Sequence, residues 1–440
     1  MNYYATMKKN KSISVISIAI LYAFLLVIYW LNGSPLSFGL YLAIGIWSYF
    51  NPLILLSLIG ASNYLPAVLG LSPLLITTGI MLCILILQTK SIFAIPILDI
   101  DYRTILWFGM FVWSMLLSIV QKDTSFMSSI LTMLICIVIV RPYINKYDKK
   151  CKSINYLMLG IGFFIVLTIL IQLGVPGFES YHWFRLAIGE RADPNSSGLL
   201  IAIFSVFSFI QLFDNLNAGL KKVIPYLICF SLGVWGLLLT QSRASILCMS
   251  LCVLAYLVFT NKKRLDRKGI FVFVALIVIV AVAVVIARLK GFSILGDALN
   301  GFIDRLNNNE SADGDRIYLL KKSIEAFMKH PILGISIEQF RINVGHIPHN
   351  TLADYMVTSG IFGIIFFIIM FIVPIIRCYP SKSKKNAILP YYCYLVCIMN
   401  FMSYSASNEK IIIPLLIILI HSIKMGENRK IYNTEIKRNY

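Results

Sequence analysis

The chain has 440 residues, of which 58% are hydrophobic and only 13% charged; its mean hydropathy is +0.80 and its formal net charge is +19. Soluble domains are roughly 45–50% apolar and about 25% charged, so this composition excludes a soluble enzyme and a disordered scaffold. It predicts an all-α polytopic membrane protein that forms a single integral-membrane domain over residues 1–440.

Fourteen apolar runs follow one another along the chain, separated by short polar breaks. They lie at about 12–31, 36–50, 53–70, 72–88, 104–120, 126–140, 154–174, 198–213, 223–240, 244–260, 269–288, 351–377, 387–404 and 410–423. A spanning helix needs about 20 residues, and several runs are shorter, so we expect about 12–14 transmembrane helices. Pro52 and Pro66 leave the number of spans in residues 36–90 open. We expect that the first run is not a cleavable signal peptide, because no small-residue cleavage site follows it and further spans do.

The distribution of charge predicts the topology. If the N-terminus with Lys8, Lys9 and Lys11 is cytoplasmic and the spans alternate, the inner segments carry the whole excess of Lys and Arg, whereas the outer segments are balanced. This is the positive-inside bias. We therefore expect a multi-pass protein of the cytoplasmic membrane with both termini cytoplasmic. Basic runs such as 261–268 are then topology signals rather than nucleic-acid contacts.

All nine cysteines lie in apolar runs or inner segments, so no disulfide framework is expected on the oxidising side. Two pairs, Cys248/Cys252 and Cys393/Cys397, have the i, i+4 spacing of one helix face. Neither has a histidine or a further cysteine pair nearby, so we interpret them as small core residues rather than zinc ligands.

The outer break Thr240–Ser245 carries one arginine, Arg243. A break of three or four residues places this side chain at or within the outer membrane boundary. Two interpretations fit. The arginine snorkels from a helix end, or it has a functional partner, because arginine is costly at membrane depth and the insertion bias gives no reason for a cation on the outer face.

A longer outer segment, about 175–197, carries Arg185 and Arg191 just before an apolar run. The sequence Asp193-Pro-Asn-Ser196 is typical of a turn whose Asn or Ser caps the next helix. Turn chemistry explains these four residues but not the two arginines. One arginine is either functional or simply paired with Glu190 or Asp193.

The large extracytoplasmic loop at 289–350 is the only sizeable non-membrane segment. Asp315 is predicted to cap a helix that ends at His330, because Pro331 disfavours helix in the residue before it. Apolar and charged side chains fall on opposite faces, as in a helix on a membrane surface. The apolar face holds Ile317, Leu320, Ile324, Phe327 and Met328, and the charged face holds Lys321, Lys322, Glu325 and Lys329.

Arg316 falls in the first turn of this predicted helix, where the helix dipole disfavours a cation. An anion held by the arginine and by the free helix N–H groups would resolve the conflict. The alternative is a surface arginine whose charge is offset by Asp313 and Asp315.

His349 lies at the outer mouth of the next apolar span, with Asn350 or Thr351 as the expected helix cap. A single histidine is more often structural than catalytic. This one shares the outer face with several arginines, and histidine is the usual proton acceptor near neutral pH. His330 and His346 are weaker candidates.

Two carboxylate pairs, Asp99/Asp101 and Asp313/Asp315, resemble pairs that hold a divalent metal on sugar-nucleotide diphosphates. Neither has supporting ligands in the sequence, so we expect no metal and no cofactor. Outer arginines suit instead a lipid-linked pyrophosphate, because guanidinium groups match phosphate oxygens bidentately. They would stabilise the leaving pyrophosphate while a histidine deprotonates an attacking hydroxyl. The same residues could alternatively bind an anionic lipid head group.

The order of these arginine, histidine and asparagine motifs along the chain resembles that of the O-antigen polymerase and O-antigen ligase superfamily of bacterial polysaccharide assembly. The resemblance covers about residues 180–370. It rests on Arg185…Gly189…Pro194-Asn195, on Ser242-Arg243-Ala244, on Asp315-Arg316 leading to His330-Pro-Ile-Leu-Gly334, and on His349-Asn350 before a span with Gly360 and Gly363. It implies a GT-C-like membrane glycosyltransferase with an O-antigen ligase-like catalytic region at 180–370 and an extracytoplasmic active site.

The resemblance further implies a polymerase of O-antigen or capsular polysaccharide. This enzyme would transfer the growing glycan from undecaprenyl pyrophosphate to an incoming lipid-linked repeat unit, without a metal. By motif position, Arg243 and Arg316 would engage the pyrophosphate and His349 would be the base. The further substrate-binding residues would be Arg185, Arg191, Asn195 and Asn350. The partners would be the undecaprenyl-pyrophosphate-linked oligosaccharide and membrane lipid, with a chain-length regulator and a flippase as candidate protein partners and no nucleic acid.

Two alternatives stay open. An O-antigen ligase would transfer the glycan to lipid A core by the same chemistry, and the motifs do not separate it from a polymerase. A lipid-linked oligosaccharide flippase or transporter would tend to show internal repeats and ionisable groups near the membrane midplane. The chain shows no internal repeat, and its notable charges lie at the outer boundary.

Overall fold

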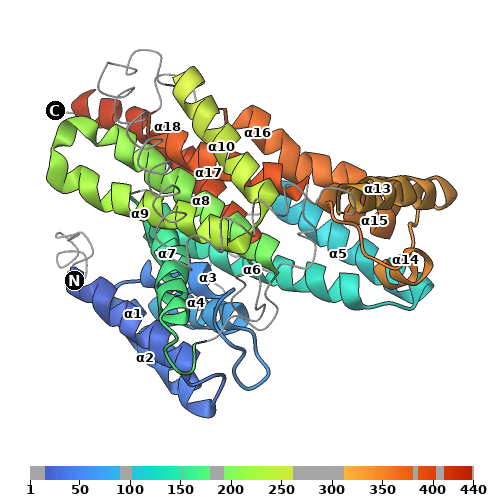
Figure 1. Ribbon diagram of the computed structural model, residues 1–440, viewed down its shortest axis with the longest axis horizontal. Helices are drawn as coiled ribbons and strands as arrows, with labels where there is room; N and C mark the ends of the chain where they lie inside the picture. The colour runs from blue at the N-terminus through green and yellow to red at the C-terminus, as the bar shows by residue number, and fades with distance from the viewer. Residues whose placement is uncertain are drawn as a thin grey trace, which may run out of the picture.

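The computed structural model describes residues 15–89, 102–150, 152–178, 193–260, 312–379, 385–402 and 411–438. Over these residues the protein is built from helices arranged in an elongated bundle (Figure 1), and the one extended pairing is an isolated bridge between Val68 and Leu71. The predicted all-α polytopic architecture is confirmed.

The helices follow the apolar runs of the sequence. They are α1 (Val15–Trp30), α2 (Pro35–Phe50), α3 (Ile54–Ala61), α4 (Pro73–Thr89), α5 (Tyr102–Gln121), α6 (Ser125–Tyr147), α7 (Ser153–Gln172), α8 (Pro194–Asp214), η2 (Leu216–Ala218), α9 (Leu220–Thr240), α10 (Arg243–Ala255), η3 (Tyr256–Thr260), α13 (Ala312–Lys329), α14 (Ile337–Val344), α15 (Thr351–Phe367), η4 (Ile368–Ile372), α16 (Val373–Arg377), α17 (Lys385–Phe401) and α18 (Ile412–Arg438). In the described part of the chain, six are long and apolar enough to cross a membrane: α5 to α9, and the helix that runs from α15 through η4 into α16.

Helix α8 forms the centre of the bundle, since nearly its whole length is buried. Helices α9, α17, α10 and α7 pack around it, and α18 packs against α17 and α6. The α5–α6 pair lies at the side of the bundle and presents large apolar residues such as Ile105 and Phe108 outward. An apolar outer surface is expected of helices that meet lipid, because lipid tails are as apolar as leucine.

The predicted run at 53–70 contains only a short helix. α3 ends at Ala61, and the chain continues through Pro66 to the Val68–Leu71 bridge without forming a full span. α3 instead packs closely against α7, where Gly60 and Gly160 each face the backbone of the other helix and leave no room for a side chain. The predicted span at 269–288 lies outside the described residues.

Helix α13, in the predicted outer loop, begins at Ala312, so the prediction that Asp315 caps it is wrong. Carboxylates are favourable in a first helical turn, which allows the helix to include both Asp313 and Asp315. Arg316 consequently lies beyond the first turn rather than in it. The other end is as predicted, because the helix stops at Lys329.

Helix α13 is fixed to α15 by the linker 330–336, which packs against a break in α15. Gly360 adopts φ 59° and ψ −140° within that helix, and the backbone N–H of Ile361 donates to the carbonyl of Pro331 at 2.8 Å. A Cβ on Gly334 or Gly360 would collide with the opposite backbone, so only glycine allows the two segments to approach this closely. This contact sets where α13 lies relative to the start of α15.

Candidate active site

Three helices begin and two end at the same end of the bundle. α8 begins after Asp193, α10 after Ser242 and α15 after Asn350, while α9 ends at Thr240 and α17 before Met402. A helix N-terminus carries unsatisfied N–H groups and a partial positive charge. The meeting of several N-termini therefore makes this end of the bundle favourable for an anion.

Asp193 opens α8. Its Oδ1 accepts hydrogen bonds from the backbone N–H of Asn195 at 2.8 Å and from Asn195 Nδ2 at 3.0 Å. The sequence predicted Asn195 or Ser196 as the cap; this is wrong, because Pro194 already occupies the first helical position, where its fixed φ suits a helix start. The contact turns the Asn195 side-chain carbonyl toward α10.

Buried hydroxyl and amide groups connect α8 to α10 and α17. Ser242 Oγ lies 3.2 Å from Asn195 Oδ1 and 3.0 Å from Ser245 Oγ, and Ser245 Oγ donates to Asn400 Oδ1 at 2.8 Å. Ser242, Ser245 and Asn400 are each only 1% exposed. Because buried polar groups are costly unless hydrogen-bonded, this network fixes the three helices relative to one another.

Gly198 permits the close packing of α8 on α10. A Cβ at this position would lie 2.7 Å from Ser242 Cβ and 2.9 Å from Ser245 Oγ. Real Cβ atoms do not approach other atoms this closely in packed interiors, so any side chain here would push the Ser242 turn away from Asn195. The glycine is therefore part of what holds the network together.

Arg243 is the first residue of α10. Only Gln241 and Ser242 separate α9 from α10, a tighter connection than the three or four residues predicted, and Gln241 has φ 51°, a conformation uncommon for residues other than glycine. The turn places the partly buried Arg243 in a first helical turn, where the dipole disfavours a cation. The anion argument that the sequence suggested for Arg316 therefore applies to Arg243 instead.

Asn350 ties the start of α15 to the end of α17. Its Oδ1 accepts a hydrogen bond from the backbone N–H of Ala353 at 3.2 Å, and its Nδ2 donates to the carbonyl of Met402 at 2.9 Å. The prediction that Asn350 or Thr351 caps this helix is confirmed, with Asn350 as the cap. Because Asn350 is hydrogen-bonded to both helices, it fixes the position of the preceding residue, His349, near the end of α17 that carries Asn400.

The pKa of His349 is lowered from its ordinary value of 6.5. His349 is exposed at the surface, yet the protein packed around its ring still desolvates the cation, and this is the largest cause. The charges of Arg316 and His346 lower the pKa further, while Asp193 raises it. The imidazole is therefore neutral, and able to accept a proton, at neutral pH.

The same charges show which predicted site residues come together. The charges of Arg316 on α13 and of Asp193 at the start of α8 both shift the pKa of His349. Asp193 is hydrogen-bonded to Asn195, whose side chain reaches the residue directly before Arg243. The site therefore unites five of the predicted residues: Asn195, Arg243, Arg316, His349 and Asn350. The other two, Arg185 and Arg191, lie outside the described residues.

Sequence reasoning missed several members of this site. Asn63 from the segment after α3 donates to Ser196 Oγ at 3.1 Å, and Asn400 joins the network from α17. The signal for Asn400 was present in the sequence, since a lone amide in an apolar span usually has a partner. Nothing in the sequence indicated that Asn63 would meet α8.

The apolar face predicted for α13 lies largely uncovered by other described residues. Ile317, Leu320, Ile324 and Met328 are exposed, whereas Leu319 and Ser323 are buried toward α15. On the charged side Lys322 pairs with Glu325 at 2.7 Å. Such a helix, with one face on the protein and an apolar face outside, is suited to lie at a membrane surface.

The cysteine pairs lie in the core, as predicted. Cys248, Cys252, Cys393 and Cys397 are all buried, and the Cys252 thiol contacts Met399 Sδ at 3.6 Å. In the part of the chain that the structure describes, no three His, Cys, Asp or Glu side chains gather in a way that could hold a metal ion. Asp99 and Asp101, and the side chains of Asp313 and Asp315, lie outside the described set.

Together the fold and this site define a multi-pass membrane protein with cationic and polar residues gathered where helices begin. Residues 228–368 match the family model of O-antigen ligases, and this match supports the predicted resemblance to the O-antigen polymerase and ligase superfamily. The matched segment contains Arg243, Arg316, His349 and Asn350. It supports O-antigen polymerase or ligase activity without distinguishing the two. No curated protein sequence matches the chain.

Proposed function

We propose that the protein polymerises lipid-linked oligosaccharide repeat units of an O-antigen or capsular polysaccharide. The growing glycan is transferred from undecaprenyl pyrophosphate to an incoming lipid-linked repeat unit at the outer face of the cytoplasmic membrane. The charge pattern of the sequence supports this orientation, with both termini cytoplasmic and the candidate site extracytoplasmic. Lipid-linked oligosaccharide and membrane lipid are the partners that the family match supports.

In the proposed reaction, a hydroxyl of the acceptor sugar attacks the anomeric carbon of the donor glycan. The new glycosidic C–O bond forms as the bond from the anomeric carbon to the pyrophosphate oxygen breaks. His349 takes the hydroxyl proton, and the bonding electron pair leaves with undecaprenyl pyrophosphate. Arg243 and Arg316 stabilise the negative charge that develops on this leaving group.

The observation that best supports this proposal is the electrostatic coupling of His349 to Arg316 and Asp193. A base must be neutral to accept a proton, and desolvation of the His349 ring, together with the neighbouring Arg316 cation, lowers the pKa of His349. The same cation attracts the pyrophosphate, so base and leaving-group site lie within range of one another. A residue that merely capped a helix would not need this arrangement.

We propose that the transfer needs no metal. Arg243 lies in the first turn of α10, where the cap residue Ser242 makes no side-chain cap hydrogen bond, and an arginine at a helix N-terminus favours phosphate without a bridging cation. The test is elongation of lipid-linked repeat units by the purified full-length protein in the presence of EDTA. Undiminished elongation is expected, and loss that is restored by added Mg²⁺ would overturn metal independence.

The proposed function is tested by reconstituting the purified protein with undecaprenyl-pyrophosphate-linked repeat units and resolving the products by chain length. Wild-type protein should give a ladder of longer glycans, and His349→Gln should not. His330→Gln is the matched control, because His330 is also an outer-loop histidine, exposed beyond the end of α13. Movement of the lipid-linked sugar across the vesicle without elongation would indicate a flippase instead.

A ligase is the second candidate, because the matched family model is described as O-antigen ligase. The chemistry at His349 and the arginines would be unchanged, and only the acceptor would differ. Deleting the gene separates the two. Loss of a polymerase leaves single repeat units on the surface lipid, whereas loss of a ligase leaves the lipid A core bare.

A further inference from the structure

A cavity of about 260 Å³ lies at the opposite end of the bundle from the candidate active site. Its walls come from α5, α6, η4 and α18. Phe371, in one wall, belongs to η4, which follows α15 and therefore lies well away from Thr351 at the start of α15. In the topology proposed above, this is the cytoplasmic side.

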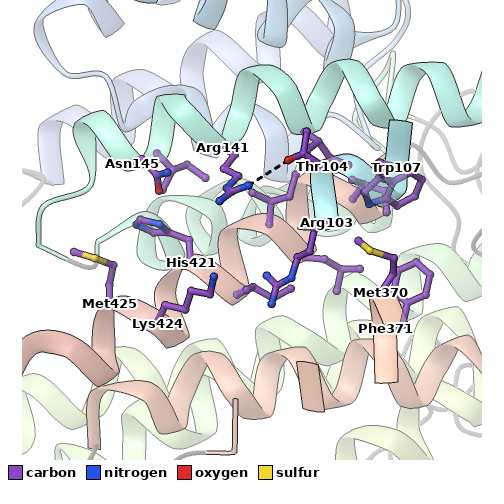
Figure 2. Close-up of a pocket in the computed structure, with 16 residues that line it drawn as sticks. Arg103, Thr104, Trp107, Arg141, Asn145, Met370, Phe371, His421, Lys424 and Met425 are labelled. Atoms are coloured by element: carbon purple, nitrogen blue, oxygen red, sulfur yellow. Dashed lines mark hydrogen bonds between the residues drawn. The ribbon is translucent and has the colours of Figure 1, made fainter. Parts of the chain in front are cut away.

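Cationic side chains from three helices line this cavity. Arg103 comes from α5, Arg141 from α6 and Lys424 from α18, with His421 one turn before Lys424. Figure 2 shows the head groups of Arg103, Arg141 and Lys424 directed into the same space. None of the described lining residues is acidic. Guanidinium and ammonium groups gathered in this way match the oxygens of a phosphate group.

The cationic groups are held in place by the protein. Arg141 Nη1 donates to Thr104 Oγ1 at 3.2 Å, and the Arg103 guanidinium lies over the Tyr102 ring, 5.4 Å from its centroid. His421 Nε2 lies 3.9 Å from Asp148 Oδ2, and that buried carboxylate also accepts from the backbone N–H of Lys152. Two arginines fixed on different helices present a preorganised pair of forks to a phosphate.

The remaining walls are mostly apolar. Trp107, Met370, Phe371 and Ile417 line the cavity beside the cations. A pocket for a whole drug-sized molecule measures about 300–1,000 Å³, so this cavity suits a head group rather than a sugar nucleotide. Basic pockets between transmembrane helices are a general way of holding anionic lipid head groups.

We propose that the cavity between α5, α6, η4 and α18 binds a phosphate group, carried by an anionic membrane lipid or free in solution. Arg103 and Arg141 grip the phosphate oxygens, and Lys424 closes the mouth. This site is separate from the proposed transfer site and does not depend on its chemistry. An occupant here would join three helices that the bundle otherwise holds mainly through apolar contacts.

The test uses the full-length protein in neutral detergent and follows its thermal unfolding midpoint. Three probes are titrated: phosphatidylglycerol, phosphatidylcholine and inorganic phosphate. Phosphatidylglycerol should raise the midpoint and phosphatidylcholine should not. Stabilisation by inorganic phosphate alone, lost in the same variants, would identify the free ion as the occupant. A response to phosphatidylglycerol only would identify a lipid head group.

Three variants decide whether the response comes from this cavity. Arg103→Gln and Lys424→Gln should each raise the apparent dissociation constant for phosphatidylglycerol about tenfold, the loss expected for one charge-assisted hydrogen bond. Lys424 is exposed, so its replacement should leave the fold intact. Lys222→Gln, an exposed cation near the start of α9 that does not line the cavity, should behave as wild type. An unchanged response in Lys424→Gln and Arg103→Gln, or equal stabilisation by phosphatidylcholine, would overturn the proposal.

Discussion

The two ends of the bundle hold arginine in different surroundings. At the candidate active site, Arg243 follows a buried chain of neutral hydrogen-bonded groups formed by Asn195, Ser242, Ser245 and Asn400. At the other end, Arg103 faces an apolar-walled cavity beside two further cations. One end sets cations beside polar groups and helix N-termini, and the other gathers cations from three helices around an apolar-walled cavity.

This difference matches two kinds of anion. The pyrophosphate leaving group is already anionic and gains a further negative charge as its bond breaks, so it is best served by dipoles and donors already fixed in position. A lipid phosphate carries permanent charge and needs lasting neutralisation in an apolar setting. We therefore expect changes at the first end to affect rate and changes at the second to affect binding and stability.

Replacing His349 should have the largest effect. His349→Gln keeps size and polarity but cannot act as the base, so elongation should fall by about 10²–10⁴-fold. The phosphatidylglycerol-dependent rise in the unfolding midpoint should be unchanged, because His349 is far from the cavity. Product length and midpoint are measured on the same preparation. Wild-type elongation by His349→Gln would exclude it as the base.

Arg243→Lys comes next and tests the guanidinium fork. Charge is kept but bidentate geometry is lost, so the elongation rate should drop roughly tenfold to a hundredfold. Arg341→Lys is the matched control, since Arg341 lies on α14 of the same loop region and pairs with Glu338 at 2.8 Å on the surface. Both variants should insert normally. Equal rates in the two would mean that Arg243 only snorkels.

The apolar runs predicted the positions of most described helices, because length and hydropathy are local properties, although only six of these helices are long and apolar enough to cross a membrane. The start of α13 was missed because Asp313 and Asp315 suit a first turn as well as a cap. The pairing of Gly334 with Gly360 could not be derived from sequence. It depends on which backbone approaches each glycine, and this is decided by tertiary packing. These motif glycines act as structural links between α13 and α15.

Tertiary packing also decides which charged residues come together, and the sequence alone does not show this. Inner-face arginines were explained as topology signals, and this explanation gives no reason to associate Arg103, Arg141 and Lys424. Each lies on a different helix, and only the packing of α5, α6 and α18 brings them to one cavity. At the site, the outer position of Arg243 and His349 was unusual enough to single them out from sequence alone.

Gly198→Ala tests whether the polar network positions Arg243. The added methyl group would meet Ser242 and Ser245 at less than 3 Å, so the α8–α10 contact must open. We expect a loss of about 1–3 kcal/mol of stability and a severalfold lower elongation rate. Gly109→Ala on α5 is the control, because nothing lies within 4 Å of its added Cβ. A Gly198 variant as stable and active as the control would show that the network tolerates displacement.

The smallest expected effect is a shift of the pH profile. The base works when neutral, so activity should rise with pH through the lowered pKa of His349 and level off by about pH 6.5, its ordinary value. Arg316→Gln removes a cation that lowers this pKa, so the acid limb of the remaining activity should move to higher pH. Asp193→Asn removes the charge that raises it yet keeps a good helix cap, so the limb should move to lower pH. If His349 is the base, the acid limb must move in opposite directions in the Arg316 and Asp193 variants, because the two charges shift its pKa in opposite directions. Shifts in the same direction, or none, would mean that the acid limb belongs to another group, and the proton acceptor would then have to be sought outside the α13–α15 pair.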